Sequence, residues 1–187
     1  GGVMSRENAL KRAEEFFDRG DFFNLLKHWV TYRSESQNEA STPQALAYLT
    51  QELTPYLEGL GFACRLLDNP SVPRLPLLFA ERIENLALPT VLTYGHGDTV
   101  LGMESHWRQG LDPWKLTVEG ERWYGRGAAD NKGQHAINLS ALDLVLRERG
   151  SLGFNLKVLI EIGEEMGSPG LREACAAHKD LLTSDVL

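Results

Sequence analysis

The chain has 187 residues, 42% of them hydrophobic and 24% charged, which is typical of a globular protein rather than a disordered or fibrous one. Its formal net charge of −7 and its lack of a basic run argue against nucleic acid or a membrane surface as partners. No apolar stretch approaches the ~20 residues of a membrane span, and two cysteines, Cys64 and Cys175, cannot form a disulfide framework, so we expect a cytoplasmic protein.

Helical periodicity marks the first sixty residues. It predicts helices over residues 5–19, 22–32 and 42–60. Thr42 as N-cap and Pro43 in the first turn open the third of these helices, and Gly59 with Gly61 ends it. Pro55 lies inside the apolar pattern of that helix, so we expect a kink there.

Short β-type runs follow, separated by Pro, Gly and Asn. They cover residues 62–67, 75–83, 90–94 and 115–118. The segment LTVEGERWYG predicts a hairpin that turns at Glu119 and Gly120. A long helix is expected from Lys132 to Arg149, with Gly150 as its terminator.

The rest of the chain predicts one more strand and one more helix. The apolar run from Phe154 to Ile162 has the length of a strand, and Ser168 with Pro169 opens a helix over residues 170–179. Helices before, between and after strands predict an α/β domain with a mixed sheet that helices cover on both faces.

The first chemically informative motif, TVLTYGHGDTV, places His96 and Asp98 at the end of an apolar strand. Two residues apart, their side chains leave an extended strand on the same side. A carboxylate beside an imidazole can hold one ring nitrogen and leave the other for a metal or a proton. An ordinary turn is the alternative for so short a motif.

The second motif, WYGRGAADNKG, surrounds the acidic residue Asp130 with glycines directly before the long helix. In one alternative, Asp130 serves only as the cap of that helix. In another, the loop binds a dinucleotide, because GRGAAD begins like G-x-G-x-x-G. Asp130 argues against this second alternative, since it puts a negative charge where a pyrophosphate would bind.

The third motif, LKVLIEIGEEMGSPG, places Glu164 and Glu165 after a nearly continuous apolar strand. Acidic pairs in loops are usually solvated and have no further role. This pair follows an expected central strand, however, and sites in open α/β sheets lie at the carboxyl ends of strands.

Together the motifs gather one imidazole and four carboxylates, without a nucleophilic Ser or Cys in a recognisable frame. Crowded carboxylates repel each other, and one or two divalent cations relieve that repulsion. His and carboxylate ligands without a thiolate suit Zn²⁺, and also Mn²⁺ or Co²⁺. The motifs therefore predict a metal-dependent hydrolase.

In their order and separation, GHGDTV, GRGAADNKG and GEEMGSPG resemble the dinuclear zinc peptidases and deacylases. This is the family of acetylornithine deacetylase, succinyl-diaminopimelate desuccinylase, aminoacylase, carnosinase and glutamate carboxypeptidase. The resemblance covers roughly residues 40–187 and includes HWRQGLDPWKL, with Trp114 in the place of the family's Phe. It implies a three-layer zinc-exopeptidase-like fold, two divalent metal ions, and hydrolysis of an amide bond in a small peptide or an N-acyl amino acid.

The resemblance also implies roles for individual residues. His96 matches a ligand of one metal, Asp130 the carboxylate that bridges both metals, and Glu165 a ligand of the other. Asp98 would orient His96. Glu164 would be the general base that takes a proton from the attacking water and then protonates the leaving amine.

Family members are longer than this chain, with a lid domain through which they form homodimers and with further acidic and His ligands. Asp185 matches a residue shortly before such an acidic ligand. We therefore expect the amino-terminal part of a catalytic domain, inactive alone, with a helical lead-in over residues 4–40 and the motifs in 41–187. Residues 1–3 are expected to be foreign to the natural chain. The Asp130–Asn131 bond is a candidate cis peptide.

Two other functions stay open. The chain could be a non-catalytic binding or assembly module on the same scaffold, or a nicotinamide-dependent enzyme that binds its cofactor tightly. Outside the motifs, His135 is expected to pack in the core or lie on the surface rather than bind a metal. The cluster of Phe16, Phe17, Phe22 and Phe23 is expected in the helix core.

Overall fold

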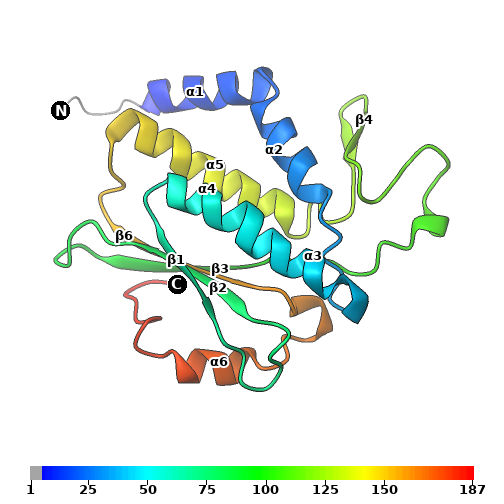
Figure 1. Ribbon diagram of the computed structural model, residues 1–187. Coiled ribbons are helices and arrows are strands. Elements are labelled where there is room, and N and C mark those ends of the chain that lie inside the picture. Colours follow the sequence, from blue (N-terminus) through cyan, green and yellow to red (C-terminus); the bar gives the residue numbers. More distant parts are fainter. Residues whose placement is uncertain (1–5) are drawn as a thin grey trace.

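A computed structural model of the protein describes residues 6–187 (Figure 1). The expectation about residues 1–3 lies outside this described part. The helices are α1 Arg6–Asp18, α2 Asp21–Val30, α3 Thr42–Ala47, α4 Thr54–Gly59, α5 Lys132–Arg149 and α6 Leu171–Ala177. The strands are β1 Ala63–Leu67, β2 Leu77–Arg82, β3 Thr90–His96, β4 Thr117–Glu119, β5 Arg122–Tyr124 and β6 Asn155–Glu161.

Four strands form one mixed sheet in the order β1-β2-β6-β3. β6 runs parallel to β3 and antiparallel to β2, and β2 runs antiparallel to β1. β4 and β5 form a separate two-stranded hairpin. The last strand of the sheet in the sequence therefore lies between two earlier ones, and all of its residues are buried.

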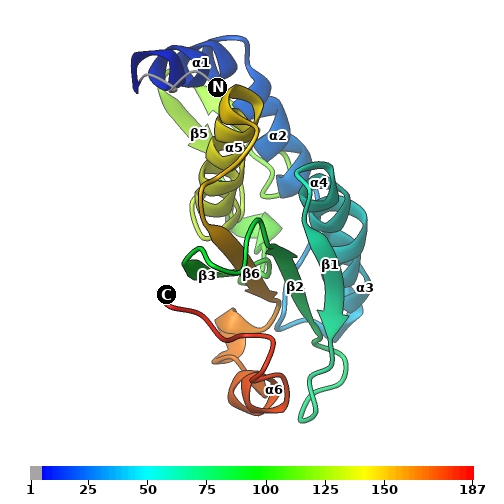
Figure 2. The ribbon, with the colours of Figure 1, turned by 90° about the vertical axis from the view of Figure 1, so that its left-hand side faces the viewer.

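Helices cover both faces of this sheet (Figures 1 and 2). α3, α4 and α5 lie over one face, where Leu57 and Leu139 pack with Val158 and Ile160 of β6. α6 lies under the other face, where Ala174 packs in a cluster with Leu159 of β6. Alternate side chains of β6 thus belong to two separate cores, as the period of a strand requires. The predicted α/β fold with a mixed, doubly covered sheet is confirmed. In the described residues, no helix combines the length and apolarity needed to cross a membrane.

The third predicted helix is interrupted by a wider turn. Tyr48–Leu53 is π-helical and lies between α3 and α4, and Pro55 follows it in the first turn of α4. Proline has no N–H to donate to the residue four positions earlier, and a π-type turn is one way in which a helix accommodates that loss. The expected distortion near Pro55 therefore takes this form.

Three local expectations need correction. Ser168 and Pro169 do not open the last helix: α6 has Gly170 as its N-cap, and the Ser168 hydroxyl donates to Glu161 instead. The hairpin turns one residue later than predicted, because Glu119 already pairs with Arg122 across it. The Phe cluster is not wholly core either.

Phe17 is 57% exposed, although its ring stacks on Trp123. Phe22 and Phe23 are partly buried against the cluster of Leu26, Val30 and Leu116, as expected. Helical spacing identified apolar residues on α1 and α2, but it could not show that Trp123 of β5 contacts Phe17 while leaving more than half of that side chain exposed.

Candidate metal centre

The ends of β3 and β6 bring two of the motifs together. The two strands are parallel, and His96 pairs in register with Glu161, so their carboxyl ends lie at the same edge of the sheet. The N–H of Gly97 donates to the carbonyl of Glu161 at 2.8 Å and ties the two outgoing loops together. This edge is where open α/β sheets hold their sites.

The candidate ligands His96, Asp130 and Glu165 converge at this edge. Each offers a donor atom, and these atoms all lie within 4.8 Å of one another. His96 is buried, Glu165 is half-buried, and Asp130 is exposed. His96 Nε2 lies 3.0 Å from Asp130 Oδ1 and 3.5 Å from Glu164 Oε2. Side chains from three distant segments thus surround one point, as the motifs predicted.

Asp130 is not the cap of α5. The residue in the cap position is Asn131, and no side-chain hydrogen bond caps the helix. The carboxylate of Asp130 accepts from His96 instead. The Asp130–Asn131 peptide bond is cis, as the resemblance implies. Asp185 lies at the opposite end of β3, where its carboxylate accepts the N–H of Thr90 at 2.8 Å, so it does not belong to this group.

Asp98 is fully buried, and it contacts both His96 and the turn that carries Glu164 and Glu165. Its carbonyl lies 3.0 Å from His96 Nδ1, and its carboxylate lies 3.4 Å from the same nitrogen. The same carboxylate accepts the backbone N–H groups of Glu164 and Glu165 at 3.1 and 3.0 Å. Asp98 therefore holds the turn that carries the acidic pair as well as the imidazole, a contact that the sequence did not predict.

The electrostatics of the group favour a cation. Burial disfavours the charged imidazole of His96, but hydrogen bonds and charge from Asp98, with the nearby Glu164, outweigh it and raise the pKa to about 9. Burial together with the charges of Asp130 and Glu164 raises the pKa of Glu165 above its ordinary value. The carboxylates that contribute to both shifts lie around one point, where a divalent ion would neutralise their charge.

Glu161 is a residue of this edge that the sequence reasoning missed. It is buried at the end of β6 and accepts hydrogen bonds from Ser168, at 2.7 Å, and from Tyr94. Burial raises the pKa of its carboxyl, although these hydrogen bonds oppose the shift. The sequence did contain a sign of this residue, because Glu161 is an acidic residue near the end of an otherwise apolar strand.

Comparison with known proteins relates this chain to a peptidase family. The family model of the peptidases M20/M25/M40 matches residues 92–185, half of the chain and all three motifs. A Beta-Ala-His dipeptidase of Mus musculus is 32% identical over 176 residues, which cover 89% of this chain and 35% of that protein. A cysteinylglycine-S-conjugate dipeptidase of Corynebacterium striatum is 42% identical over 137 residues, covering 72% of this chain and 29% of that protein.

The crystal structure of human carnosine dipeptidase 1 superposes on this chain with a TM-score of 0.84 and 27% identity, covering 96% of this chain and 40% of the other. The chain therefore spans between about three tenths and two fifths of the length of these relatives. Acetylornithine deacetylase of Proteus mirabilis is also similar, at 32% identity over 151 residues. Because the family model matches half of the chain and the fold agrees with it, the chain belongs to the M20/M25/M40 peptidase family.

Proposed function

We propose that the protein to which this chain belongs is a metal-dependent exopeptidase or deacylase that hydrolyses dipeptides or N-acyl amino acids. The observation that carries this proposal is the convergence of His96, Asp130 and Glu165, in a chain of this peptidase family. The relatives named as dipeptidases support a dipeptide as substrate, and the similarity to acetylornithine deacetylase keeps an N-acyl amino acid in the same class.

The residues present fit a divalent ion. One imidazole and two carboxylates offer nitrogen and oxygen donors without a thiolate, the set that suits Zn²⁺ and also Co²⁺ or Mn²⁺. We propose that Asp130, the most exposed of the three, would hold such ions together with His96 and Glu165. When bound, such ions polarise a substrate carbonyl and lower the pKa of a coordinated water.

Glu164 is the proposed general base. Its carboxylate is partly exposed beside the ligand group, and its backbone N–H is held by Asp98. From there its Oε2 can take a proton from the attacking water and return it to the leaving amine nitrogen. Asp98, buried and already bonded on both sides, would keep His96 and the acidic pair in position rather than move a proton.

We also propose that residues 1–187 alone do not turn over substrate. Two ions with about four ligands each need more side chains than the three that converge in the described part of the chain. The relatives are longer, and we propose that the remaining ligands belong to the sequence that this chain does not cover.

The test is Glu164→Gln in the full-length protein, assayed with a panel of dipeptides and N-acyl amino acids at saturating Zn²⁺ or Co²⁺. We expect kcat to fall by at least about 100-fold, because a general base supplies roughly that factor, while metal content by atomic absorption stays that of the parent. The matched control is Glu173→Gln, an exposed carboxylate on α6.

Retention of most activity by Glu164→Gln would remove Glu164 from this role. A parent protein that binds metal but hydrolyses no member of the panel would favour a non-catalytic module. A parent that binds no divalent metal would contradict the proposed function itself.

A further inference from the structure

A chain of hydrogen-bonded polar groups runs from the backbone of His96 into α5. The amide oxygen of Asn131 accepts the backbone N–H of His96 at 3.0 Å and lies 3.2 Å from Nδ1 of His135. The amide nitrogen of Asn131 donates to Gln134 at 3.1 Å. Both ends of the Asn131 side chain are therefore engaged, and its oxygen ties the end of β3 to the start of α5.

These contacts fix the proton on His135. The amide oxygen of Asn131 can only accept, so Nδ1 of His135 must be the donor. Nε2 then has a lone pair, which accepts the hydroxyl of Tyr48. The ring is buried and lies near Lys132 and His96, and burial with these two positive groups lowers its pKa to about 3. His135 is thus a neutral imidazole with a single tautomer.

Tyr48 also contacts the end of β3 directly, through its ring. It is fully buried in the π-helical turn, and its ring packs against the backbone of Gly97. A Cβ at Gly97 would lie 2.8 Å from a ring carbon, so only glycine permits this approach. The Lys132 ammonium lies 4.7 Å from the ring centroid on another side. The ring and hydroxyl of Tyr48 therefore have one position each.

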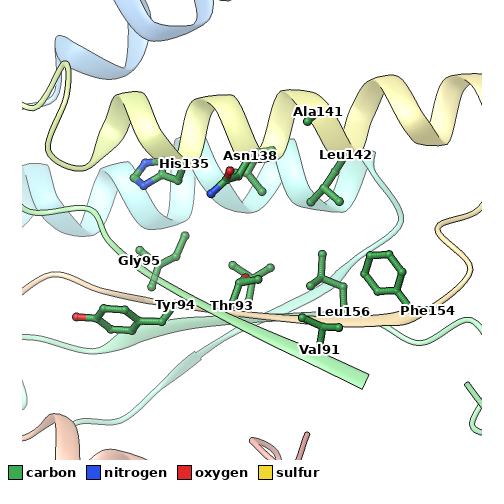
Figure 3. A pocket seen from close by; sticks show the side chains of 13 residues that line it. Val91, Thr93, Tyr94, Gly95, His135, Asn138, Ala141, Leu142, Phe154 and Leu156 are labelled. Atoms are coloured by element: carbon green, nitrogen blue, oxygen red, sulfur yellow. The ribbon is translucent and has the colours of Figure 1, made fainter. Parts of the chain in front are cut away.

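Figure 3 shows the place of His135 in this arrangement: it projects from α5 toward Gly95, the residue before His96. Beside it is an apolar cavity of about 310 Å³ between α5 and the β3–β6 pair, lined by side chains such as Leu142 and Leu156. Thr93 and Asn138 also line this space, and the imidazole of His135 lies at its end nearest Gly95. An apolar side chain would have served packing equally well at that end.

We propose that Tyr48, His135 and Asn131 form a positioning bracket, which sets the orientation of His96 and Asp130 for the metal. Asn131 follows Asp130 directly and bonds the His96 backbone, so one amide aligns both candidate ligands. His135 and Tyr48 fix that amide and the loop at Gly97. The inference rests on the proposed metal function, and the experiment below distinguishes failure of that function from failure of the bracket.

The experiment compares two tyrosines of the same core in the full-length protein. Tyr48→Phe removes the hydroxyl that bonds His135 and keeps the ring against Gly97. Tyr56→Phe is the matched control, because its buried hydroxyl has no hydrogen-bond partner in the described residues. His135→Leu removes the bond to Asn131, and His135→Gln, which can still donate and accept, is the conservative rescue.

Two readouts apply to each variant: Co²⁺ affinity with the visible absorption spectrum, and the hydrogen-exchange rate of the His96 amide in the metal-free protein. The ¹⁵N shifts of His135 are measured in the parent and in the two tyrosine variants. We expect Tyr48→Phe and His135→Leu to weaken Co²⁺ binding about tenfold and to alter its spectrum, as loss of a partner behind a ligand does. The His96 amide should exchange about tenfold faster. His135→Gln should recover most of both effects, and Tyr56→Phe should change neither.

The parent should show His135 protonated at Nδ1 only. Equal Co²⁺ affinity, spectrum and His96 exchange in Tyr48→Phe and Tyr56→Phe would overturn the bracket, as would an Nε2–H tautomer of His135. If the full-length parent binds no Co²⁺, the proposed metal function fails, while the exchange and tautomer measurements still decide whether the bracket exists. Thermal melting identifies a variant that has lost its fold. If either Tyr48→Phe or His135→Leu is unfolded, the other one is compared with the parent.

Discussion

At the residue scale, Gly133 marks the closest approach between two parts of the candidate site. It lies in the first turn of α5, and a Cβ there would lie 1.8 Å from the carbonyl oxygen of Ala128 in the second motif. Backbone cannot rotate away as a side chain can. The glycine therefore lets the loop that carries Asp130 fold against the helix that follows it.

We predict that Gly133→Ala lowers the free energy of unfolding by about 3 kcal/mol or more, the upper range for overpacking. Gly59→Ala is the control, since no atom lies within 4 Å of its added Cβ and its φ is ordinary. That variant should be unchanged or up to about 1 kcal/mol more stable. Urea denaturation measures both, and equal stabilities would contradict the proposed contact.

The sequence predicted individual site residues where chemistry and order coincide in a motif. His96, Asp130 and Glu165 each lie within three residues of glycines and next to the start or end of a predicted element, and this pattern could be recognised in the sequence. The sequence did not predict the hydrogen bonds that link Asn131, His135 and Tyr48. Tyr48 lies 87 residues from His135, and nothing in the helical pattern around it distinguishes a bonding tyrosine from a packing one.

At the scale of elements, Glu84 joins the end of β2 to the start of β6. Its carboxylate accepts the N–H groups of Leu152 and Gly153 at 2.7 and 2.9 Å and that of Arg82 Nε at 3.0 Å. Burial favours the neutral carboxyl, but these hydrogen bonds outweigh it and lower the pKa of Glu84. The loop before β6 is therefore held by an ionised group.

This shift predicts a pH dependence of stability. Because the folded pKa lies below the unfolded value of about 4.3, the stabilisation is complete above that value and is lost as pH falls through the folded pKa. Glu84→Gln should lower the unfolding free energy at pH 7 by about 1 to 3 kcal/mol, because three donors lose their charged acceptor. Between pH 5 and 3, the difference between parent and variant should shrink.

Chemical denaturation at each pH measures that difference, and Glu121→Gln on the exposed hairpin turn is the control. A difference that stays constant from pH 5 to 3 would contradict the prediction.

Most elements were predictable because each has a clear period and clear ends. α5 is the best case, since it runs from Lys132 to Arg149 and ends at Gly150 as expected. The predicted start of α6 was wrong for a physical reason. Serine is a residue type that often caps helices, but the hydroxyl of Ser168 donates to the buried Glu161. A long-range partner there outweighs a local preference.

At the scale of the whole molecule, β6 is the centre of both cores. It pairs with β2 on one side and β3 on the other, and all seven of its residues are buried. Among the described residues, β4 and β5 pair with each other and with no other strand, and both contain exposed residues. Local opening should therefore be easiest in the hairpin and hardest in β6.

We predict that native-state hydrogen exchange, measured by NMR, is slowest for the amides of β6 and that these amides open only with global unfolding. The amides of β4 and β5 should exchange faster than those of β6 and should be insensitive to low urea concentrations. Protection of the hairpin equal to that of β6 would show a more uniform molecule than this arrangement implies.

The position of β6 also constrains how the polypeptide can acquire its shape during synthesis. β2 and β3 leave the ribosome first, yet neither neighbours the other in the finished sheet. Until the segment ending at Glu161 emerges and inserts between them, His96 lacks the strand beside it and the acidic turn that follows. A nascent chain interrupted before that point would thus contain a histidine and an aspartate of the proposed centre, but no framework to bring them together.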